Sequence, residues 1–365
     1  MKNKIKIKLF DPHTDDSEKK IILKILDNHF WASGAGAGYV EKFEMQFRKF
    51  VNSKSCIAVN SGTSALNLAL SLIDIKNKDV IVPSFTFVST VHSILLNGGK
   101  PKFIDVNPST MCLDHSQIEK LINKNTAAII PVHYGGMSCE MNEIMKISKN
   151  YKLPIIEDAA HAAGTKFKKN RIGSHGNIVC FSFHPVKNLA MPTGGLLSIN
   201  DPNYKIMTDK LRARRWCGIS DRKEFEYDVK EMGWNYYMNE FSAGIGLVQL
   251  KKLDKMNKAR KRIAKIYSKE IKLEEKMQFN NDCSYHLYWI RVKNRKGFMK
   301  KMLDDGIETG IHYKPVHKMT FYKSNMKLPK TDKCANEIVS IPIHQNLTDR
   351  DISKIIKSIN KNSTC

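Results

Sequence analysis

The sequence predicts an α/β fold with a mostly parallel sheet that carries helices on both faces. Between about residues 54 and 200, short runs rich in β-branched residues alternate with stretches of helical periodicity, and this alternation is typical of parallel sheets. A long basic helical pattern follows at about 247–272 and leads into a shorter α/β pattern. We therefore expect a large domain at residues 1–248 and a smaller C-terminal domain at residues 249–365.

Apolar runs in the first part of the chain are expected to form the strands of this sheet. They are short and bounded by polar or turn-forming residues, at 55–59, 80–83, 102–106, 127–132, 154–157 and 177–181. Helices are expected between them, for example at 64–72 and 139–149. Ligands of such sheets bind at the carboxyl ends of the strands, so the residues directly after each strand are the first candidates for a site.

The net charge of +24 raises the question of a nucleic-acid partner. The lysines are dispersed, however, and in the densest run they alternate with Leu253, Met256, Ile263 and Ile266 at helical spacing. That is the pattern of an amphipathic helix with a solvated basic face. We therefore expect no nucleic-acid partner, although the positive field favours the approach of an anionic substrate.

The composition also indicates where in the cell the protein is expected to be located. The chain of 365 residues is long enough for a large core, and no run approaches the roughly 18–20 apolar residues of a membrane span. The basic start lacks the apolar stretch of a signal peptide. Eight cysteines are scattered singly, without a C-x-x-C pair or a Cys/His cluster. We therefore expect reduced thiols, no metal site and a cytoplasmic protein.

Two residues at strand ends suggest a cofactor. Lys187 lies in the run S-F-H-P-V-K-N directly after the strand at 177–181, and Asp158 ends the apolar run that begins at Leu153. A lysine that forms a Schiff base and an aspartate that pairs with a protonated pyridine nitrogen suit pyridoxal 5′-phosphate (PLP). The alternative for Asp158 is a helix N-cap, since A-A-H-A-A follows it.

The run N-S-G-T-S-A-L at 60–66 follows the strand at 55–59 and opens a helix. Gly62 permits a tight turn, while Thr63 and Ser64 offer hydroxyl and backbone N–H groups at a helix N-terminus, where anions bind. The alternative is an ordinary helix cap without a ligand.

The order of these motifs resembles the DegT/DnrJ/EryC1/StrS family of sugar aminotransferases, which are PLP enzymes of fold type I, the aspartate aminotransferase-like superfamily. Three further segments share the resemblance: P-S-F-T-F-V-S-T at 83–90, G-W-N-Y-Y-M-N-E at 233–240 and G-I-H-Y-K-P-V-H at 310–317. It extends from Trp31 to about Ile359. It implies a seven-stranded, mostly parallel sheet in the large domain and a smaller C-terminal α/β domain.

The resemblance also implies contacts to the cofactor. In this family the segment at 60–66 and the serine at Ser182 hold the phosphate, the aromatic at Phe87 stacks on the pyridine ring, and the residue at His161 lies near the phenolic oxygen. The family further implies a homodimer in which Asn235 reaches the cofactor of the other subunit. The alternatives are a core phenylalanine, a core histidine and a turn asparagine.

Contacts to the substrate are less defined by the resemblance. Arg215 and Lys314 are candidates for holding a substrate pyrophosphate, and Tyr313 and His317 belong to the C-terminal motif, where a packing role is an equal alternative. The chain also departs from the family at four positions: Pro192, Thr193, Cys217 and Tyr237 replace the more usual residues. These departures affect the expected substrate more than the expected reaction.

The resemblance implies an aminotransferase that moves an amino group from L-glutamate to a nucleotide-linked keto-deoxysugar, at C4 or at C3. A sugar dehydratase of the same family is one alternative, but that branch typically has histidine where Lys187 stands. A keto-cyclitol aminotransferase is another. From a different class, a non-catalytic basic binding protein on this fold is opposed by the presence of Lys187, Asp158 and Ser182 together.

Overall fold

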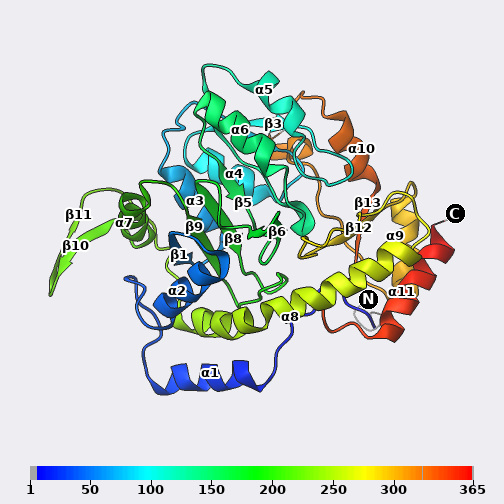
Figure 1. Ribbon diagram of the computed structural model, residues 1–365, viewed down its shortest axis with the longest axis horizontal. Coiled ribbons are helices and arrows are strands. Elements are labelled where there is room, and N and C mark those ends of the chain that lie inside the picture. Colours follow the sequence, from blue (N-terminus) through cyan, green and yellow to red (C-terminus); the bar gives the residue numbers. More distant parts are fainter. Residues whose placement is uncertain (1–5, 323, 364–365) are drawn as a thin grey trace.

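The computed structural model describes residues 6–322 and 324–363 and confirms the α/β class (Figure 1). One four-stranded sheet has the order β1-β9-β8-β5, and a three-stranded sheet has the order β3-β2-β4. Parallel bridges between Ile129 and Ile155 and between Val132 and Asp158 join β4 to β5 along the edge that the two sheets share. The strands are β1 (Ser55–Val59), β2 (Asp79–Pro83), β3 (Lys100–Ile104), β4 (Thr126–Ile129), β5 (Ile156–Asp158), β8 (Ile178–Ser182) and β9 (Gly195–Ile199).

The pairing within these sheets is mostly parallel, as expected. The strands β2, β3 and β4 are parallel to one another, and β5 is parallel to β8. Strand β9 is antiparallel to both β1 and β8, between which it lies. Strand β9 was not among the predicted strands, although its run G-L-L-S-I follows the turn-forming residues P-T-G at 192–194.

Both faces of the sheet are covered, because alternate residues of a strand point to opposite sides. In β8, Ile178 and Cys180 belong to one buried cluster, whereas Val179 and Phe181 belong to another. The first cluster includes α3 and α4, and the second includes α2 and part of α8. The helices of this part are α1 (Asp16–Asp27), α2 (Tyr39–Val51), α3 (Gly62–Ser71), α4 (Val88–Leu96), α5 (Ile118–Leu121), α6 (Met141–Tyr151), α7 (Tyr204–Arg215) and α8 (Glu240–Glu270).

Helix α8 begins earlier than the predicted helix at 247–272. Its N-cap is Asn239, whose side chain accepts a hydrogen bond from the Ser242 backbone N–H. A β-carbon on Gly244 would lie 2.5 Å from Cδ1 of Ile25, so the glycine lets α8 pack closely against α1. Glycine is a weak helix former, which explains why the sequence pattern placed the helix start after it.

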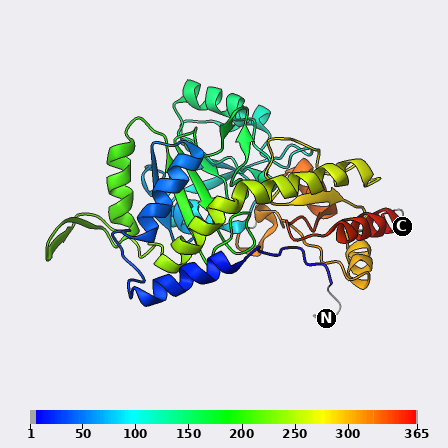
Figure 2. The same ribbon diagram turned by 60° about the horizontal axis from the view of Figure 1, so that its bottom comes forward.

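The C-terminal elements form a smaller α/β unit at the far end of α8 (Figures 1 and 2). Its strands β12 and β13 pair antiparallel. Residues 6–9 of the N-terminal segment bond to Gly306 and Glu308, so this short segment packs with the C-terminal elements. The predicted boundary at 248/249 falls inside α8 and stays a prediction. The elements are β12 (Tyr288–Arg291), α9 (Arg295–Asp304), α10 (Pro329–Glu337), β13 (Ile338–Ile341) and α11 (Asp349–Asn362).

Two small hairpins lie outside these sheets. One pairs β6 (Lys166–Phe167) with β7 (Asn170–Arg171), and the other pairs β10 (Ile219–Lys223) with β11 (Glu226–Val229). The β10–β11 hairpin projects from the body beside α7 (Figure 1). Short 3₁₀ helices complete the described elements at His115–Gln117, Tyr134–Gly136, Val316–Lys318 and Thr320–Tyr322.

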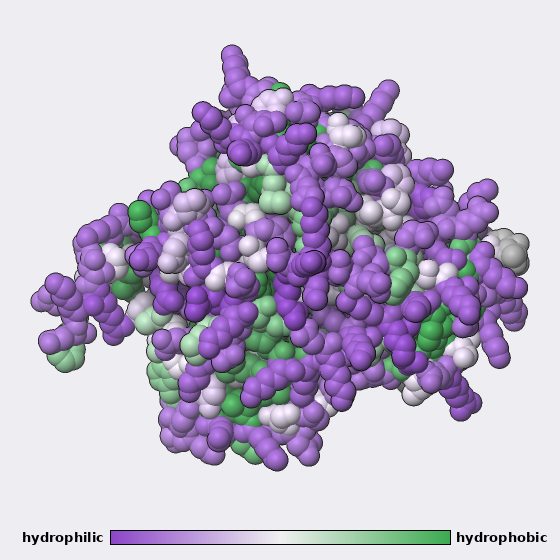
Figure 3. All heavy atoms as spheres, in the orientation of Figure 1, coloured by the Kyte–Doolittle hydropathy of each residue, from purple (hydrophilic) through white to green (hydrophobic). Residues whose placement is uncertain are grey.

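The surface is largely hydrophilic on the face shown in Figure 3, in keeping with dispersed rather than clustered charge. Among the helices in residues 6–322 and 324–363, none combines the length and the apolarity that a bilayer crossing requires.

Candidate active site

A cavity of about 370 Å³ lies at the carboxyl ends of the strands. Its floor is formed by residues that directly follow β1, β2, β5 and β8, and its wall by a segment of the C-terminal unit. This is the edge at which parallel sheets bind ligands. Lining residues used below are Ser61, Gly62, Thr63, Phe87, Asp158, His161, Ser182, Lys187, Thr193, His312 and Tyr313.

Lys187 projects into this cavity from the loop between β8 and β9. The loop is closed by backbone bonds between Phe183 and Gly194 (2.8 Å) and between Phe183 and Met191 (2.8 Å). The neighbouring Asn188 donates from Nδ2 to Oδ1 of Asn257 on α8 (2.9 Å). Burial lowers the pKa of the Lys187 amine to about 8, while Asp158 opposes this shift. The amine is therefore accessible in both its charged and its neutral form near neutral pH.

Asp158 is the second residue that the prediction placed here, and its carboxylate is held at both oxygens. The Ala160 backbone N–H donates to Oδ1 (3.0 Å), and the Thr90 hydroxyl donates to Oδ2 (2.7 Å). The side chain is buried, at 4% exposure. The segment after Asp158 forms turns rather than a helix, so the helix-cap alternative does not apply.

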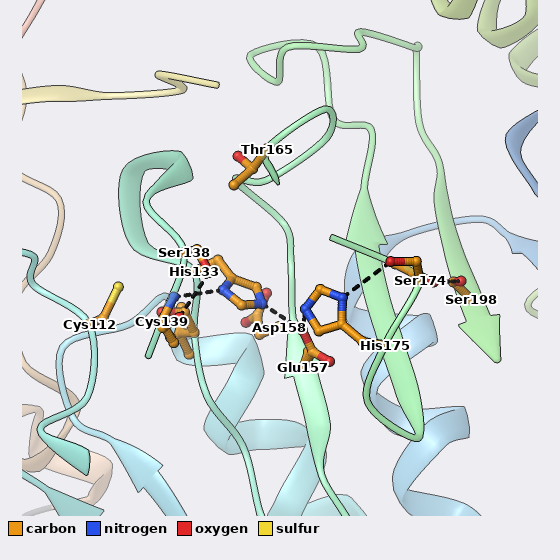
Figure 4. A network of polar contacts seen from close by, with 12 residues as sticks. Cys112, His133, Ser138, Cys139, Glu157, Asp158, Thr165, Ser174, His175 and Ser198 are labelled. Atoms are coloured by element: carbon orange, nitrogen blue, oxygen red, sulfur yellow. Dashed lines mark hydrogen bonds and ion pairs between the residues drawn. The ribbon is translucent and has the colours of Figure 1, made fainter. Parts of the chain in front are cut away.

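Figure 4 shows a buried polar network next to Asp158, in which Glu157 lies between His133 and His175. His133 Nδ1 accepts from the Cys139 backbone N–H (3.1 Å), which assigns the proton to Nε2, and Nε2 donates to Glu157 (2.9 Å). Burial raises the pKa of Glu157 to about 7 and lowers the pKa of His133 to about 4. The His133 backbone N–H also donates to the Asp158 carbonyl (3.0 Å). The pair therefore fixes the strand end that carries Asp158.

The N-terminus of α3 and Ser182 form a site for an anion in the cavity lining, here called the anion cradle. Helix α3 begins at Gly62, and the Ser61 side chain caps it by accepting from the Ser64 backbone N–H (3.1 Å). A β-carbon on Gly62 would lie 2.6 Å from Cβ of Ser182, so only glycine lets the serine approach the helix end. Ser61, Thr63 and Ser182 thus surround a helix N-terminus, where a phosphate is favoured.

Ser64 was predicted to contact the cofactor, but its side chain does not line the cavity. It is buried, and its hydroxyl donates to Oδ1 of Asn60 (2.6 Å), so it serves the cap network. Ser61, one turn earlier, faces the cavity instead. Both outcomes follow from the same motif: the run at 60–66 is a helix cap and an anion cradle at once.

The remaining cofactor candidates of the chain line the middle of the cavity. His161 Nδ1 accepts from the Gly135 N–H (3.1 Å), and its Nε2 faces the Tyr313 hydroxyl (3.0 Å). Burial, with Lys187 and His312 adding to it, lowers the pKa of His161 well below its usual range. Phe87 is 55% exposed and lines the cavity, so it is no core residue.

Arg215 requires a correction as a substrate-binding candidate. It is fully buried, and its Nη1 donates to Glu44 (2.7 Å) and to the Ala58 carbonyl (3.0 Å). Its Nη2 donates to the Ala35 carbonyl (3.0 Å). Because these partners occupy the guanidinium inside the protein, the prediction that Arg215 holds a substrate pyrophosphate is wrong. The sequence pattern did not reveal that Glu44 on α2 would pack against it.

Three further candidates lie outside the cavity lining. His317 is buried, with Nδ1 2.6 Å from the Ser84 hydroxyl and Nε2 3.1 Å from Asp332. Lys314 is exposed beside Tyr313, which does reach the cavity. Asn235 is exposed, and its carbonyl accepts from the Asn60 side chain (3.3 Å). The geometry of a single chain leaves the roles of Lys314 and Asn235 as proposals.

The sequence analysis missed several residues of the site. Thr90 lies one turn into α4 in the segment at 83–90, so the motif contained it, but its contact with Asp158 depends on how α4 packs. His286 and His312 come from the C-terminal unit, and His286 lies 3.5 Å from the Lys187 amine across 99 residues of sequence. A contact between such distant positions has no local signal.

The donor set of the cavity fits PLP in charge and shape. The anion cradle matches a phosphate, Asp158 matches a protonated pyridine nitrogen, and Lys187 matches an aldehyde-reactive amine. Gly62 lets Ser182 lie against the start of α3, because a β-carbon there would be 2.6 Å from Cβ of Ser182, and the serine hydroxyl thereby joins the helix N-terminus at the cavity. The fold and the site together define a PLP-dependent enzyme of the α/β class.

Comparisons with known proteins define the family. The profile of the DegT/DnrJ/EryC1/StrS aminotransferase family matches residues 12–360. The UDP-4-amino-4,6-dideoxy-N-acetyl-beta-L-altrosamine transaminase of Campylobacter jejuni is 32% identical over 359 residues, which cover 94% of this chain and 93% of that protein. The spore coat polysaccharide biosynthesis protein SpsC of Bacillus subtilis is 32% identical over 346 residues, 88% of each chain.

A solved structure agrees with this result. Helicobacter pylori PseC, an aminotransferase involved in the biosynthesis of pseudoaminic acid, superimposes with a TM-score of 0.92 at 26% identity and covers 98% of each chain. The chain therefore belongs to the DegT/DnrJ/EryC1/StrS aminotransferase family, and it is a PLP-dependent aminotransferase.

Proposed function

We propose that Lys187 is the lysine that binds the cofactor and moves protons, and that Asp158 holds the pyridine nitrogen protonated. The observation that carries this proposal is that both residues line one cavity together with the N-terminus of α3 and Ser182. The pKa of about 8 for the Lys187 amine suits a group that must accept and return a proton. Asp158 accepts two hydrogen bonds that favour its charged form.

The other lining residues support the same arrangement. Gly62, Thr63 and Ser182 would hold the phosphate, with Ser61 in place of Ser64. Phe87, exposed into the cavity, would cover one face of the ring. His161 keeps its proton on Nε2 because Nδ1 accepts from Gly135, and it would donate toward the phenolic oxygen or Tyr313.

Bound PLP supplies an aldehyde that condenses with amines and a ring that accepts electron density. The residues of this chain supply the rest. Lys187 would accept the proton from the α-carbon of the amino donor and hold it for return, and it would act in the reverse direction with the acceptor. Asp158 stabilises the positive ring nitrogen, because a carboxylate at hydrogen-bond distance shifts a pKa by roughly 1–3 units.

We further propose that the acceptor is a nucleotide-linked keto-deoxysugar and the donor L-glutamate, with amination at C4 or at C3. The relatives named above include a transaminase of a UDP-linked amino sugar and a polysaccharide biosynthesis protein, which supports this substrate class. Lys187, rather than a histidine, argues against the dehydratase branch. The product would serve the synthesis of a polysaccharide or another glycan.

The test of this function is a panel of UDP- and dTDP-linked keto-sugars incubated with the purified protein and ¹⁵N-glutamate. We expect one sugar to gain a single ¹⁵N atom, detected by mass spectrometry, with 2-oxoglutarate formed in equal amount. A panel of keto-cyclitols forms the matched arm. Transfer to a cyclitol alone would overturn the proposed substrate class, and loss of a hydroxyl without nitrogen gain would favour the dehydratase.

We also propose that the enzyme is a homodimer with composite sites. Asn235 is exposed, and the projecting β10–β11 hairpin exposes the apolar side chains of Phe225 (97%), Tyr227 (62%) and Val229 (51%) together. Such apolar exposure is typical of a contact surface. Mixing Lys187→Ala subunits with Asn235→Ala subunits should then restore activity, because one site of each heterodimer keeps both residues. No recovery despite proven subunit exchange would show that Asn235 acts within its own chain.

A cytoplasmic location is part of the same proposal. The cysteines of residues 6–322 and 324–363 are free thiols, and most are buried, which fits a reducing compartment. The working division into residues 1–248 and 249–365 is retained, with α8 as the connection between the two parts.

A further inference from the structure

His286 lies directly behind Lys187 and is not part of the cavity lining. It belongs to the segment before β12, and its Nε2 lies 3.5 Å from the Nζ of Lys187. The side chain is 1% exposed. The C-terminal unit therefore places a fully buried imidazole against the amine, on the side away from the open cavity.

The ring of His286 is fixed between two other rings. The Phe10 ring stacks on it at 5.6 Å with an angle of 16° between the planes, and the His161 ring lies 4.4 Å away. Within the described residues, its Nδ1 has no hydrogen-bond partner. Among the residues that the structure describes, the ring therefore makes its one hydrogen-bond contact through Nε2, to Lys187.

The imidazole of His286 is neutral in this environment. Burial lowers its pKa well below the usual range, and the cationic or ionisable neighbours Lys187, His161, Arg260 and His312 lower it further. Arg260 on α8 is itself buried beside the Tyr285 carbonyl (3.3 Å). A neutral imidazole has one nitrogen with a free lone pair, so His286 can accept a hydrogen bond from the amine.

The Lys187 amine needs such an acceptor whenever it is free. A buried ammonium loses its hydration, and burial alone disfavours the charged form. The ionisable groups that face the amine come from four segments of the chain: Asp158, His161, His184, His286 and His312. Asp158 is the anion among them, and in the proposed site it pairs with the cofactor. His286 remains to hold the amine.

We propose that His286 is a positioning residue that holds the free amine of Lys187 through Nε2 and keeps it aimed into the cavity for proton transfer. This inference rests on the proposed role of Lys187. A hydrogen bond to the ammonium stabilises the charged form, so His286 also keeps the amine from becoming too weak a base to take up the proton. It acts through Lys187 and contacts no substrate.

The tests use three substitutions that separate the two ring nitrogens. A glutamine side chain at position 286 places its amide near the Nε2 position and can replace the contact, whereas an asparagine amide reaches only the Nδ1 position. Phenylalanine fills the volume without a polar atom. The matched control is His344→Gln, because His344 is also buried in the C-terminal unit and also has an unpartnered Nδ1, but its Nε2 contacts the Lys8 carbonyl (3.1 Å).

The first measurement is the pH dependence of PLP uptake by protein freed of cofactor, since only the neutral amine reacts. We expect a midpoint near pH 8 for the wild-type protein, in line with the pKa of Lys187. His286→Asn and His286→Phe should lower the midpoint by roughly one pH unit. His286→Gln and His344→Gln should stay within a few tenths of a unit. Equal midpoints in all variants would overturn the inference.

The second measurement is the half-reaction of the holoenzyme with glutamate that carries hydrogen or deuterium at the α-carbon. A misplaced amine makes proton transfer more rate-limiting, so we expect the isotope effect to rise in His286→Asn and in His286→Phe but not in His286→Gln. A merely structural defect would lower the active fraction without changing the isotope effect. If the Phe variant fails to fold, the Gln and Asn pair decides the outcome.

The proposed roles of Lys187 and His286 would be contradicted by different results. If borohydride reduction of the wild-type holoenzyme labels a lysine other than Lys187, the role of Lys187 falls and that of His286 falls with it. If Lys187 is labelled but the Asn and Gln variants behave alike in both measurements, only the proposal for His286 is overturned.

Discussion

The floor and the wall of the cavity differ in how their residues are positioned. The floor consists of residues at or just beyond strand ends, such as Asp158, the last residue of β5, and Lys187 in the loop after β8. The wall comes from residues 310–317, where Tyr313 reaches the cavity, Lys314 is exposed and His317 is buried against Ser84. Adjacent residues of the wall thus have three different environments.

The difference has a topological cause. Parallel strands bring their carboxyl ends to one edge, so a polar residue that follows a strand is placed in the site by the sheet itself. The wall is placed by docking of the C-terminal unit on the large one, through contacts such as Asp105 with the Thr331 backbone N–H (2.6 Å). Docking contacts depend on shape over long sequence separations, so they carry no local pattern.

The largest expected effect lies in the floor. Lys187→Ala should abolish the visible absorption of the bound cofactor and lower the rate of amino transfer by about 10⁴-fold or more, because the amine is both the attachment point and the proton carrier. Absorption spectra and single-turnover rates check this. Lys314→Ala in the wall is the control, with the absorption band retained.

The next effect concerns the other residue of the floor. Asp158→Asn should still bind PLP but should transfer protons more slowly by about 10²–10⁴-fold, since several kcal/mol of charge stabilisation are lost and each 1.36 kcal/mol is a factor of ten. Stopped-flow spectra of the glutamate half-reaction report the rate. Near-normal turnover in this variant would mean that Asp158 only supports the turn at Ala160.

A third prediction separates structure from function near the cavity. Arg215→Ala should cost roughly 3 kcal/mol of unfolding free energy, because the buried Glu44 loses this partner and keeps only Arg212 (3.1 Å), while the Ala58 carbonyl loses its donor. Lys314→Ala should change stability by less than about 0.5 kcal/mol, while it raises the KM for the keto-sugar. Urea unfolding and steady-state kinetics distinguish the two. A stable Arg215→Ala protein with weak sugar binding would show that Arg215 contacts the substrate after all.

The smallest effect is expected at a departure from the family. Tyr237 is half-buried and pairs in a bridge with Val59, outside the cavity lining. Tyr237→Arg should alter the KM for the keto-sugar by a few-fold and leave the glutamate half-reaction within about twofold, since the donor needs no sugar pocket. A collapse of the half-reaction alone would place Tyr237 on the cofactor side.

These cases show how much of the site can be predicted from the sequence. It identified the strand-end residues Lys187, Asp158 and Ser182, because each follows an apolar run in a distinctive motif. It misplaced Arg215, since an arginine at the end of a helix looks the same in sequence whether its side chain faces a substrate or a buried Glu44. It missed His286, whose position beside Lys187 exists only after the C-terminal unit has docked.

The site of cofactor attachment is tested most directly by borohydride reduction of the purified holoenzyme followed by peptide mapping. The central claim is that the cofactor is attached at the floor of the strand-edge cavity. We predict that the label is found on the peptide that contains Lys187 and on no other, and that Lys187→Ala protein takes up none. A label on any other lysine would contradict the assignment of the site.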